Sequence, residues 1–469
     1  MLFNSIEFLI FFPIVFAIYW MLKNSVSKQN ILLLISSYIF YGWWDWRFLS
    51  LIVYSSLIDY IAGLKIEKSS TQKNKKRWLL LSLVSNLGLL AVFKYYNFFA
   101  DSFSQAMLTL GWKVDDLTLN IILPVGISFY TFQTLSYTID VYRNTLKPTK
   151  DIVTFFTYVS LFPQLVAGPI ERASNLIPQI KNKRIFKSSQ FNDGIFQIIV
   201  GLFRKIVIAD NLAIYVDTVY GNPELHNGSS LLLATVFYAF QIYYDFSGYS
   251  DIAIGTAKLL GFNFNQNFNF PYFSKSITEF WRRWHISLSS WLKDYLYISL
   301  GGNRKGIKIT YRNLLITMLL GGLWHGSSWN FVIWGAIHGM ALASEKYTFS
   351  KLKIKNFNAF GSLWTLTIVL LSWVFFRAQD LSTAILILKR IFSFNYSMPF
   401  IGNINTVIIA SMMLFLGLCF DVFIFRKKTD LEYFGSTVKT GSLAIFVSVV
   451  IILLALFYST SNNFIYFQF

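Results

Sequence analysis

Apolar runs of roughly 17–25 residues recur along the whole chain, and this is the length that a helix needs to cross the hydrocarbon core of a bilayer. Hydrophobic residues make up 55% of the 469 residues and charged residues only 14%, well below the ~25% of soluble domains. A β-barrel would show short segments of alternating hydrophobicity, which the chain lacks. The sequence therefore predicts an all-α polytopic integral membrane protein, with residues 1–469 as a single membrane-embedded domain.

The apolar runs give a set of candidate spans, and we expect about 11–12 transmembrane helices from them. The first run follows no basic segment and carries Glu7, so we expect a retained span and not a cleaved signal peptide. The candidate spans are Ile6–Leu22, Ile31–Trp44, Leu49–Leu64, Trp78–Phe93, Leu119–Tyr137, Phe191–Ile208, Leu231–Phe246, Thr310–Trp324, Trp329–Leu342, Leu363–Phe376, Val407–Phe425 and Ser442–Phe457.

Two further segments do not fit a simple crossing. Val153–Val166 is apolar but has basic loops on both sides, which predicts a re-entrant segment that turns at Gly168 and Pro169. Tyr272–Arg312 is too polar to span, yet its apolar residues recur at spacings of three and four. That pattern predicts an amphipathic helix at the cytoplasmic interface.

The formal net charge of +18 is concentrated in the loops between apolar runs. Lys65 to Arg77 holds six basic residues and one acid, which indicates a cytoplasmic loop under the positive-inside rule. This explanation accounts for the charge better than nucleic-acid binding does. Counting spans from this loop places both the N-terminus and the C-terminus outside the cell.

One histidine, His325, lies where an outward span turns into an inward one, in Leu323-Trp-His-Gly-Ser-Ser-Trp-Asn. Gly321, Gly322 and Gly326 would let a backbone or a substrate approach closely. An ionisable residue at membrane depth indicates function, and a desolvated, neutral histidine can act as a general base. Trp324 and Asn330 are further candidates for the substrate path.

The other histidines have simpler explanations. His285 lies on the amphipathic stretch, where tryptophan and arginine neighbours suggest interface anchoring without explaining the histidine itself. His338 falls within a span and is expected to bond a neighbouring hydroxyl or carbonyl. His226 lies in a polar loop and is expected to be solvated.

Two acids, Asp245 and Asp251, interrupt the apolar stretch that begins at Leu231. At membrane depth they indicate a water-filled cavity, partners for a buried cation, or an ion or proton pathway. Ser247, Ser250 and Asp251 would share one helical face if Gly248 does not break the helix.

The C-terminal tail, residues 462–469, is strongly aromatic and has no charged side chain. It is either part of an interfacial aromatic belt or a segment that folds back into an outward-facing cavity and presents the Tyr466 hydroxyl.

Several motifs together resemble the membrane-bound O-acyltransferase family, in its bacterial branch of alginate and peptidoglycan O-acetyltransferases and the teichoic-acid D-alanyl transfer protein. The motifs are Phe3-Asn-Ser, Ile122-Leu-Pro-Val-Gly-Ile-Ser-Phe-Tyr-Thr-Phe-Gln, Gln164-Leu-Val-Ala-Gly-Pro-Ile-Glu-Arg, Tyr244-Asp-Phe-Ser-Gly-Tyr-Ser-Asp, Phe280-Trp-Arg-Arg-Trp-His-Ile-Ser-Leu, Leu323-Trp-His-Gly and Phe464-Ile-Tyr-Phe-Gln-Phe.

The resemblance implies helices around a central channel, with His325 as the catalytic residue and His285 in a cytoplasmic-side motif. It implies that Tyr466 carries the acyl group outward. It further implies acetyl-CoA or an acyl-carrier thioester as donor and no covalently bound cofactor. No Asp, His or Cys spacing in the sequence suggests a catalytic metal. A periplasmic hydrolase-like partner would pass the acetyl group to an exported polysaccharide, and the setting would be a bacterial inner membrane.

Three alternatives stay open. Peptidoglycan O-acetylation or D-alanyl transfer would use the same mechanism. A transporter or export channel would use Asp245, Asp251 and a central histidine as a proton relay, but the repeated halves typical of transporters are absent from the sequence. A scaffold for polymer synthesis would leave the hairpin around His325 and the terminal tyrosine without a role.

Overall fold

The computed structural model describes residues 1–115, 117–166, 168–352, 359–393, 397–427, 440–458 and 464–465. Helices dominate these residues, and no strand occurs among them. They divide into two compact units, Met1–Lys187 with Ala257–Phe264 and Ser188–Thr256 with Asn265–Phe469. The single domain over residues 1–469 stays a prediction.

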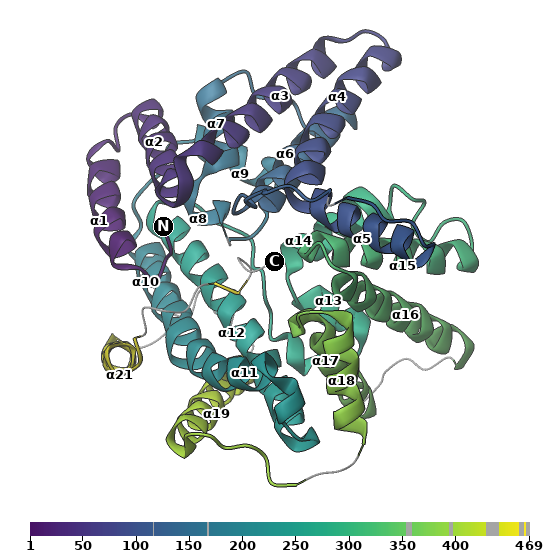
Figure 1. The fold of residues 1–469 in the computed structure, drawn as a ribbon. Coiled ribbons are helices and arrows are strands. Elements are labelled where there is room, and N and C mark those ends of the chain that lie inside the picture. Colours follow the sequence, from purple (N-terminus) through teal and green to yellow (C-terminus); the bar gives the residue numbers. More distant parts are fainter. Residues whose placement is uncertain are drawn as a thin grey trace. The chain divides into compact units, whose positions relative to one another are not determined.

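The helices of the first unit are labelled in Figure 1. They are α1 (Ile6–Met21), α2 (Val26–Asp45), α3 (Leu49–Lys68), α4 (Gln72–Leu90), α5 (Tyr96–Thr109), α6 (Ile127–Tyr142), α7 (Ile152–Ser160), α8 (Phe162–Leu165) and α9 (Ala173–Lys181).

The sequence placed one span of this unit wrongly. The predicted span Leu119–Tyr137 begins as irregular chain, and helix α6 starts only at Ile127, after Gly126 with φ of 76°. A side chain on Gly126 would also lie 2.8 Å from the Leu165 carbonyl oxygen. The left-handed glycine and its close backbone contact set the helix start, which hydrophobicity alone could not reveal.

The predicted re-entrant segment is interrupted. α7 and α8 are nine and four residues long and are separated at Leu161. At 1.5 Å per residue, neither helix approaches the ~30 Å of a hydrocarbon core. The side chains from Tyr158 to Leu165 are buried, which fits irregular backbone enclosed by protein.

The second unit contains the remaining helices (Figure 1). They are α10 (Ser188–Leu202), the π-helical segment η3 (Phe203–Ala209), α11 (Asp210–Gly221), α12 (Gly228–Leu259), α13 (Ile277–Arg283), α14 (Ile286–Trp291), the π-helical segment η6 (Leu292–Tyr297), α15 (Ile307–His325), α16 (Trp329–Leu352), α17 (Ala359–Arg377), α18 (Leu381–Phe392), α19 (Ile404–Lys427) and α21 (Thr440–Phe457).

Gly248 lies within α12 and does not break it. Glycine is needed there for packing, because glycines on α10 and α12 face each other. A Cβ on Gly248 would lie 2.7 Å from the Gly201 carbonyl oxygen, and one on Gly255 would lie 2.6 Å from the Gly194 carbonyl oxygen. Only glycine permits such close backbones. The continuous α12 therefore presents its polar residues from one rigid helix.

The sequence predicts one amphipathic helix over Tyr272–Arg312, and this prediction is wrong. The stretch is divided into α13, α14 and η6, and His285 with φ of 41° separates the first two. Phe280, Trp284 and Leu288 are buried inside the protein rather than exposed to lipid. Short helices that pack on several sides produce the same three- and four-residue spacing as a surface helix.

Four helical stretches among the described residues are long and apolar enough to cross a membrane: Val26–Lys68, Gln72–Thr109, Phe360–Arg377 and Ile404–Lys427. Large apolar side chains are exposed on these and on shorter apolar helices, for example Leu9 on α1 and Ile452 on α21. Water would penalise this exposure and lipid would not. The chain is an all-α membrane protein, while the number of crossings and the side of each terminus stay predictions.

Candidate active site

His285 and His325, from two separate motifs, lie in one site with ring centroids 6.4 Å apart. His325 is the last residue of α15, and His285 lies in the turn between α13 and α14. The Trp324 ring contacts both, at 5.9 Å from His285 and 5.1 Å from His325. The structure thus brings together three of the residues that the sequence singled out.

Glycines hold His325 in place by fixing the hairpin of α15 and α16. A Cβ on Gly322 would lie 2.1 Å from the Phe331 carbonyl oxygen, and one on Gly335 would lie 2.3 Å from the Met318 carbonyl oxygen. The sequence left open whether glycine here admits a backbone or a substrate. At Gly322 it admits a backbone, and this contact fixes the end of α15 that carries His325.

The substitution Gly322→Ala is expected to lower the free energy of unfolding by about 1–3 kcal/mol, because the added methyl group overpacks the helix contact. Thermal unfolding in detergent measures this. The matched control is Gly88→Ala on α4, where an added Cβ meets nothing within 4 Å. It should leave stability equal or slightly higher, since alanine favours helix. Equal melting temperatures for the two variants would contradict the packing role of Gly322.

Aromatic rings surround His325 and keep water away from it. The Trp334 ring lies 5.0 Å away and the Phe376 ring 5.3 Å away, and His325 is 3% exposed. Asn330, the other candidate of this hairpin, donates from Nδ2 to the Ala378 carbonyl oxygen at 2.9 Å. That bond ties the start of α16 to the end of α17 beside the histidine. A part in the substrate path stays a prediction for Asn330.

A hydrogen-bond network fixes the tautomer of His285. Asn267 Oδ1 accepts from the Ser287 backbone N–H at 3.3 Å and from Ser287 Oγ at 2.9 Å. The same oxygen lies 3.1 Å from His285 Nδ1. Because a carbonyl oxygen can only accept, Nδ1 carries the proton and Nε2 is the basic nitrogen.

Burial lowers the pKa of His285 to about 3, so the ring is neutral at pH 7. A group with such a low pKa is a weak proton acceptor, since an efficient general base has a pKa near the working pH. His285 is better suited to orienting a substrate or the neighbouring ring than to removing a proton. A place on the cytoplasmic side of the path stays a prediction for His285.

Asn267 is a residue of the candidate site that the sequence analysis missed. It is fully buried, and its Nδ2 donates to Ser250 Oγ on α12 at 3.1 Å. Its backbone oxygen also accepts from the Ile286 N–H at 2.8 Å. Asn267 lies in the irregular stretch before α13, where no periodicity marks a position as buried. No signal in a single sequence distinguishes it from a loop asparagine.

Asp245 and Asp251 pair with two cations on the π-helical segment η3. Lys205 Nζ lies 2.6 Å from Asp245 and 2.7 Å from Asp210. Arg204 bridges Asp251 and Asp421, each at 2.6 Å. Among the possibilities that the sequence left open, partners for buried cations are confirmed. Lining of the substrate path stays a prediction for both acids.

Lys205 and Arg204 were also missed, although the signal was present. Two adjacent cations stand inside the apolar run Phe191–Ile208, and a charge within a span must find a partner. The partners come from elements far away in the sequence, such as Asp421 on α19.

The C-terminal tail reaches the same region. Phe464 is fully buried, and its ring lies 4.3 Å from Tyr249 and 5.6 Å from Phe246. The Ile465 N–H donates to Asp245 Oδ2 at 2.9 Å. Phe246 in turn contacts His285 at 4.7 Å between ring centroids. Tyr466 itself lies outside the described residues.

The two remaining histidines are structural. His338 Nε2 lies 3.0 Å from Ser372 Oγ, and Trp281 Nε1 donates to His338 Nδ1 at 3.3 Å, which confirms the expected bond to a hydroxyl. The expectation of a solvated His226 is wrong. Its ring is buried against Phe400 at 4.8 Å, because the polar loop folds back on the protein.

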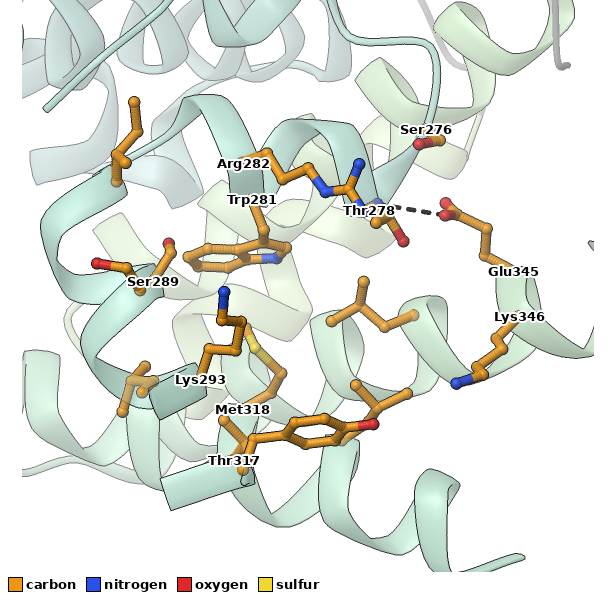
Figure 2. Close-up of a pocket in the computed structure, with 16 residues that line it drawn as sticks. Ser276, Thr278, Trp281, Arg282, Ser289, Lys293, Thr317, Met318, Glu345 and Lys346 are labelled. Atoms are coloured by element: carbon orange, nitrogen blue, oxygen red, sulfur yellow. Dashed lines mark hydrogen bonds between the residues drawn. The ribbon is translucent and has the colours of Figure 1, made fainter. Parts of the chain in front are cut away.

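A pocket of about 740 Å³ opens among α13, α14, η6, α15 and α16, and Figure 2 shows the side chains around the Trp281 ring. Arg282, Lys293 and Lys346 line it. Glu345 also lines it and accepts from the Thr278 N–H at 3.3 Å, the bond dashed in Figure 2. Trp281 lies 5.6 Å from Trp334, whose ring contacts His325. The pocket therefore ends about two aromatic rings from His325.

The lining residues are Ser276, Thr278, Trp281, Arg282, Ile286, Ser289, Ser290, Leu292, Lys293, Tyr297, Leu314, Thr317, Met318, Leu342, Glu345 and Lys346.

Known proteins match this chain over most of its length. The model of MBOAT, the membrane-bound O-acyltransferase family, matches residues 40–382, which include both histidines of the site. "Probable alginate O-acetylase AlgI" of Pseudomonas putida is 45% identical over 84% of this chain and 81% of its own length. "Peptidoglycan O-acetyltransferase" of Helicobacter pylori is 34% identical over 100% of this chain and 98% of its own.

A more distant match is "Teichoic acid D-alanyltransferase" of Bacillus subtilis, 27% identical over 49% of this chain and 60% of its own length. The matching family model and the two long alignments agree with the apolar helices of the structure. The chain belongs to the membrane-bound O-acyltransferase family and is a multi-pass membrane O-acyltransferase.

Proposed function

We propose that this protein moves an acetyl group from a cytoplasmic thioester across a bacterial inner membrane for O-acetylation of an exported polysaccharide of the alginate type. The observation that carries the proposal is the juxtaposition of His325, His285 and the C-terminal tail. The His285 ring lies near both His325 and Phe246, and Phe246 contacts Phe464 of the tail.

In this proposal His325 is the general base. It takes the proton from an attacking hydroxyl, the oxygen forms a bond to the acetyl carbonyl carbon, and the carbon–sulfur bond of the thioester breaks. The proton then passes to the leaving thiolate, so that the products are an ester and a free thiol. Exclusion of water by Trp334 and Phe376 protects the thioester from hydrolysis.

The pocket beside Trp281 supports entry of the donor. Arg282, Lys293 and Lys346 present three cations at its wall, which suits a phosphorylated donor such as acetyl-CoA or an acyl-carrier protein. The apolar side chains Leu292, Leu314 and Met318 suit a flexible, uncharged arm that carries the thioester inward. Arg282, Leu292 and Lys293 lie on the stretch Tyr272–Arg312, which the sequence assigns to the cytoplasmic side.

The Tyr466 hydroxyl is the proposed first acceptor. Burial of Phe464 and the bond from the Ile465 N–H to Asp245 support a tail that enters the protein rather than an aromatic belt in the lipid interface. An acetyl-tyrosine facing outward would then be passed to a periplasmic partner with a hydrolase-like site, and from there to the polymer.

The names of the relatives favour acetyl over D-alanyl transfer. The alginate and peptidoglycan relatives have a higher sequence identity to this chain than the D-alanyl relative has, and they align with more of it. Peptidoglycan is the second candidate acceptor, because the Helicobacter pylori relative aligns over the whole chain. A transporter is less well supported, since Asp245 and Asp251 are each held in an ion pair with a basic side chain.

Mass spectrometry of the C-terminal peptide tests this function. After incubation with acetyl-CoA labelled in the acetyl group, we expect the peptide that contains Tyr466 to gain one labelled acetyl group. The adduct should vanish in the presence of hydroxylamine, which cleaves a phenolic ester. Tyr466→Phe is the control that should carry no label. An unlabelled wild-type tail, under conditions in which the polymer is acetylated, would remove Tyr466 from the pathway.

A further inference from the structure

We propose that Asp245 is a positioning residue that anchors the C-terminal tail for acyl transfer, with Lys205 holding Asp245 in place. The inference rests on the proposed function, because it concerns how the tail is presented to the histidines. It assigns to the ion pair Lys205–Asp245 a task beyond neutralising charge in the protein interior.

Both oxygens of the Asp245 carboxylate accept from donors. Oδ1 lies 2.6 Å from Lys205 Nζ, and Oδ2 accepts from the Ile465 N–H at 2.9 Å. Asp245 is 2% exposed and Lys205 is 1% exposed. A hydrogen bond from a backbone N–H to a buried carboxylate is charge-assisted and stronger than one to a neutral acceptor. At Ile465 the tail is therefore held by a hydrogen bond that water cannot readily replace.

Lys205 fixes the direction of this acceptor. Its Nζ also lies 2.7 Å from Asp210 Oδ1, so Lys205 is held between two carboxylates. The same Nζ lies 5.9 Å from the centroid of the Tyr249 ring. With Lys205 clamped at one oxygen, Asp245 can turn only its second oxygen to the tail. The π-helical segment η3 supplies Lys205 and the adjoining Asp210 begins α11. Such π-helical insertions are frequent at functional sites.

An aromatic seat lies beside the anchor. Phe464 packs on Phe246 and Tyr249, which follow Asp245 within the next turn of α12. Phe246 also contacts His285. Consecutive Cα atoms are about 3.8 Å apart, so an anchored Ile465 confines the residue that follows it. The same α12 helix thus holds the tail and contacts His285.

The variant Asp245→Asn tests the anchor with almost no change of shape. One oxygen becomes an amide nitrogen that can only donate, and it must face either Lys205 or the Ile465 N–H. The charged partner Lys205 keeps the remaining oxygen, so the amide group faces the tail and the bond is lost. Asp251→Asn is the matched control on the same helix, because the Asp251 oxygens accept from Gln197 and Arg204.

Hydrogen–deuterium exchange of the Ile465 amide in the purified, full-length protein reads the anchor without reference to acyl chemistry. We expect slow exchange in the wild type, and exchange at least about tenfold faster in Asp245→Asn, as the loss of one charge-assisted hydrogen bond predicts. Asp251→Asn should leave it unchanged. Phe464→Ala, which leaves every buried charge paired, should also accelerate it. Unprotected exchange in the wild type, or no acceleration in Asp245→Asn and Phe464→Ala, would overturn the anchor.

The rate of Tyr466 acetylation then separates anchoring from positioning. We expect kcat for this step to fall at least about tenfold in Asp245→Asn while KM for acetyl-CoA stays unchanged, because the donor pocket is intact. A full rate with a loosened tail would overturn the positioning role and leave the proposed function standing. Absence of acetylation in the wild type would overturn the proposed function and positioning together, while the exchange result would still report the anchor.

Discussion

His325→Ala is expected to lower acetyl transfer by about 10²–10⁴-fold, the usual contribution of a positioned general base. The imidazole stands at the end of α15 among Trp324, Trp334 and Phe376. The ring of His285 lies 6.4 Å away, but burial lowers the pKa of His285 to about 3, which makes it a poor substitute as a base. Transfer of labelled acetyl from acetyl-CoA measures the loss.

The design must separate lost chemistry from lost packing, because alanine leaves a cavity in the aromatic surround. His325→Gln keeps most of the volume and the polarity but has no basic nitrogen, so it should lose nearly as much activity as alanine. The control is His226→Gln, a buried histidine that packs on Phe400. It should keep wild-type turnover at a normal protein level. Substantial activity in His325→Gln would rule out base catalysis by this residue.

Features that depend on short range were predictable from the sequence. The hairpin Leu323–Asn330 combined small residues, a histidine and a reversal of direction, and α15 and α16 end and begin there as expected. The spans after Thr310 coincide with helices α15, α16, α17, α19 and α21. In each of these, length and hydrophobicity of a single run determine the helix.

Features that depend on distant partners were not predictable in the same way. The sequence marks Asp245 and Asp251 as unusual, but their ion-pair partners Lys205 and Arg204 lie on another element. Asn267 fixes the tautomer of His285 from a segment without regular structure. The role of such residues depends on where their partners lie in three dimensions, and a single sequence does not give those positions.

The errors have physical causes of the same kind. Helix α6 begins at Ile127 because Gly126 takes a left-handed turn against the Leu165 carbonyl, a contact with a residue nearly forty positions later. Tyr272–Arg312 looked like a surface helix because burial on several short helices mimics the spacing of one amphipathic face. Local periodicity cannot tell burial by protein from burial by lipid.

Tyr466→Phe is the second large effect that we expect, and it should reduce acetylation of the polymer to the background level. Phenylalanine keeps the aromatic ring but removes the hydroxyl oxygen that is the proposed acceptor of the acetyl group. Polymer-bound acetate, released by mild base and quantified from cells that carry each variant, gives the measurement. Protein level in the membrane should stay normal, because the two side chains differ by a single hydroxyl group.

The matched control is Tyr458→Phe, which removes the hydroxyl of another tyrosine near the C-terminus. Tyr458 is 42% exposed and follows α21, so its loss should leave acetylation unchanged. Because the anchor at Ile465 is a backbone N–H, Tyr466→Phe should also leave that bond in place. The Ile465 amide should therefore exchange as slowly as in the wild type while acetylation is lost. Wild-type acetylation in Tyr466→Phe would exclude the tyrosine as carrier and would direct the search for the acceptor to the polymer itself.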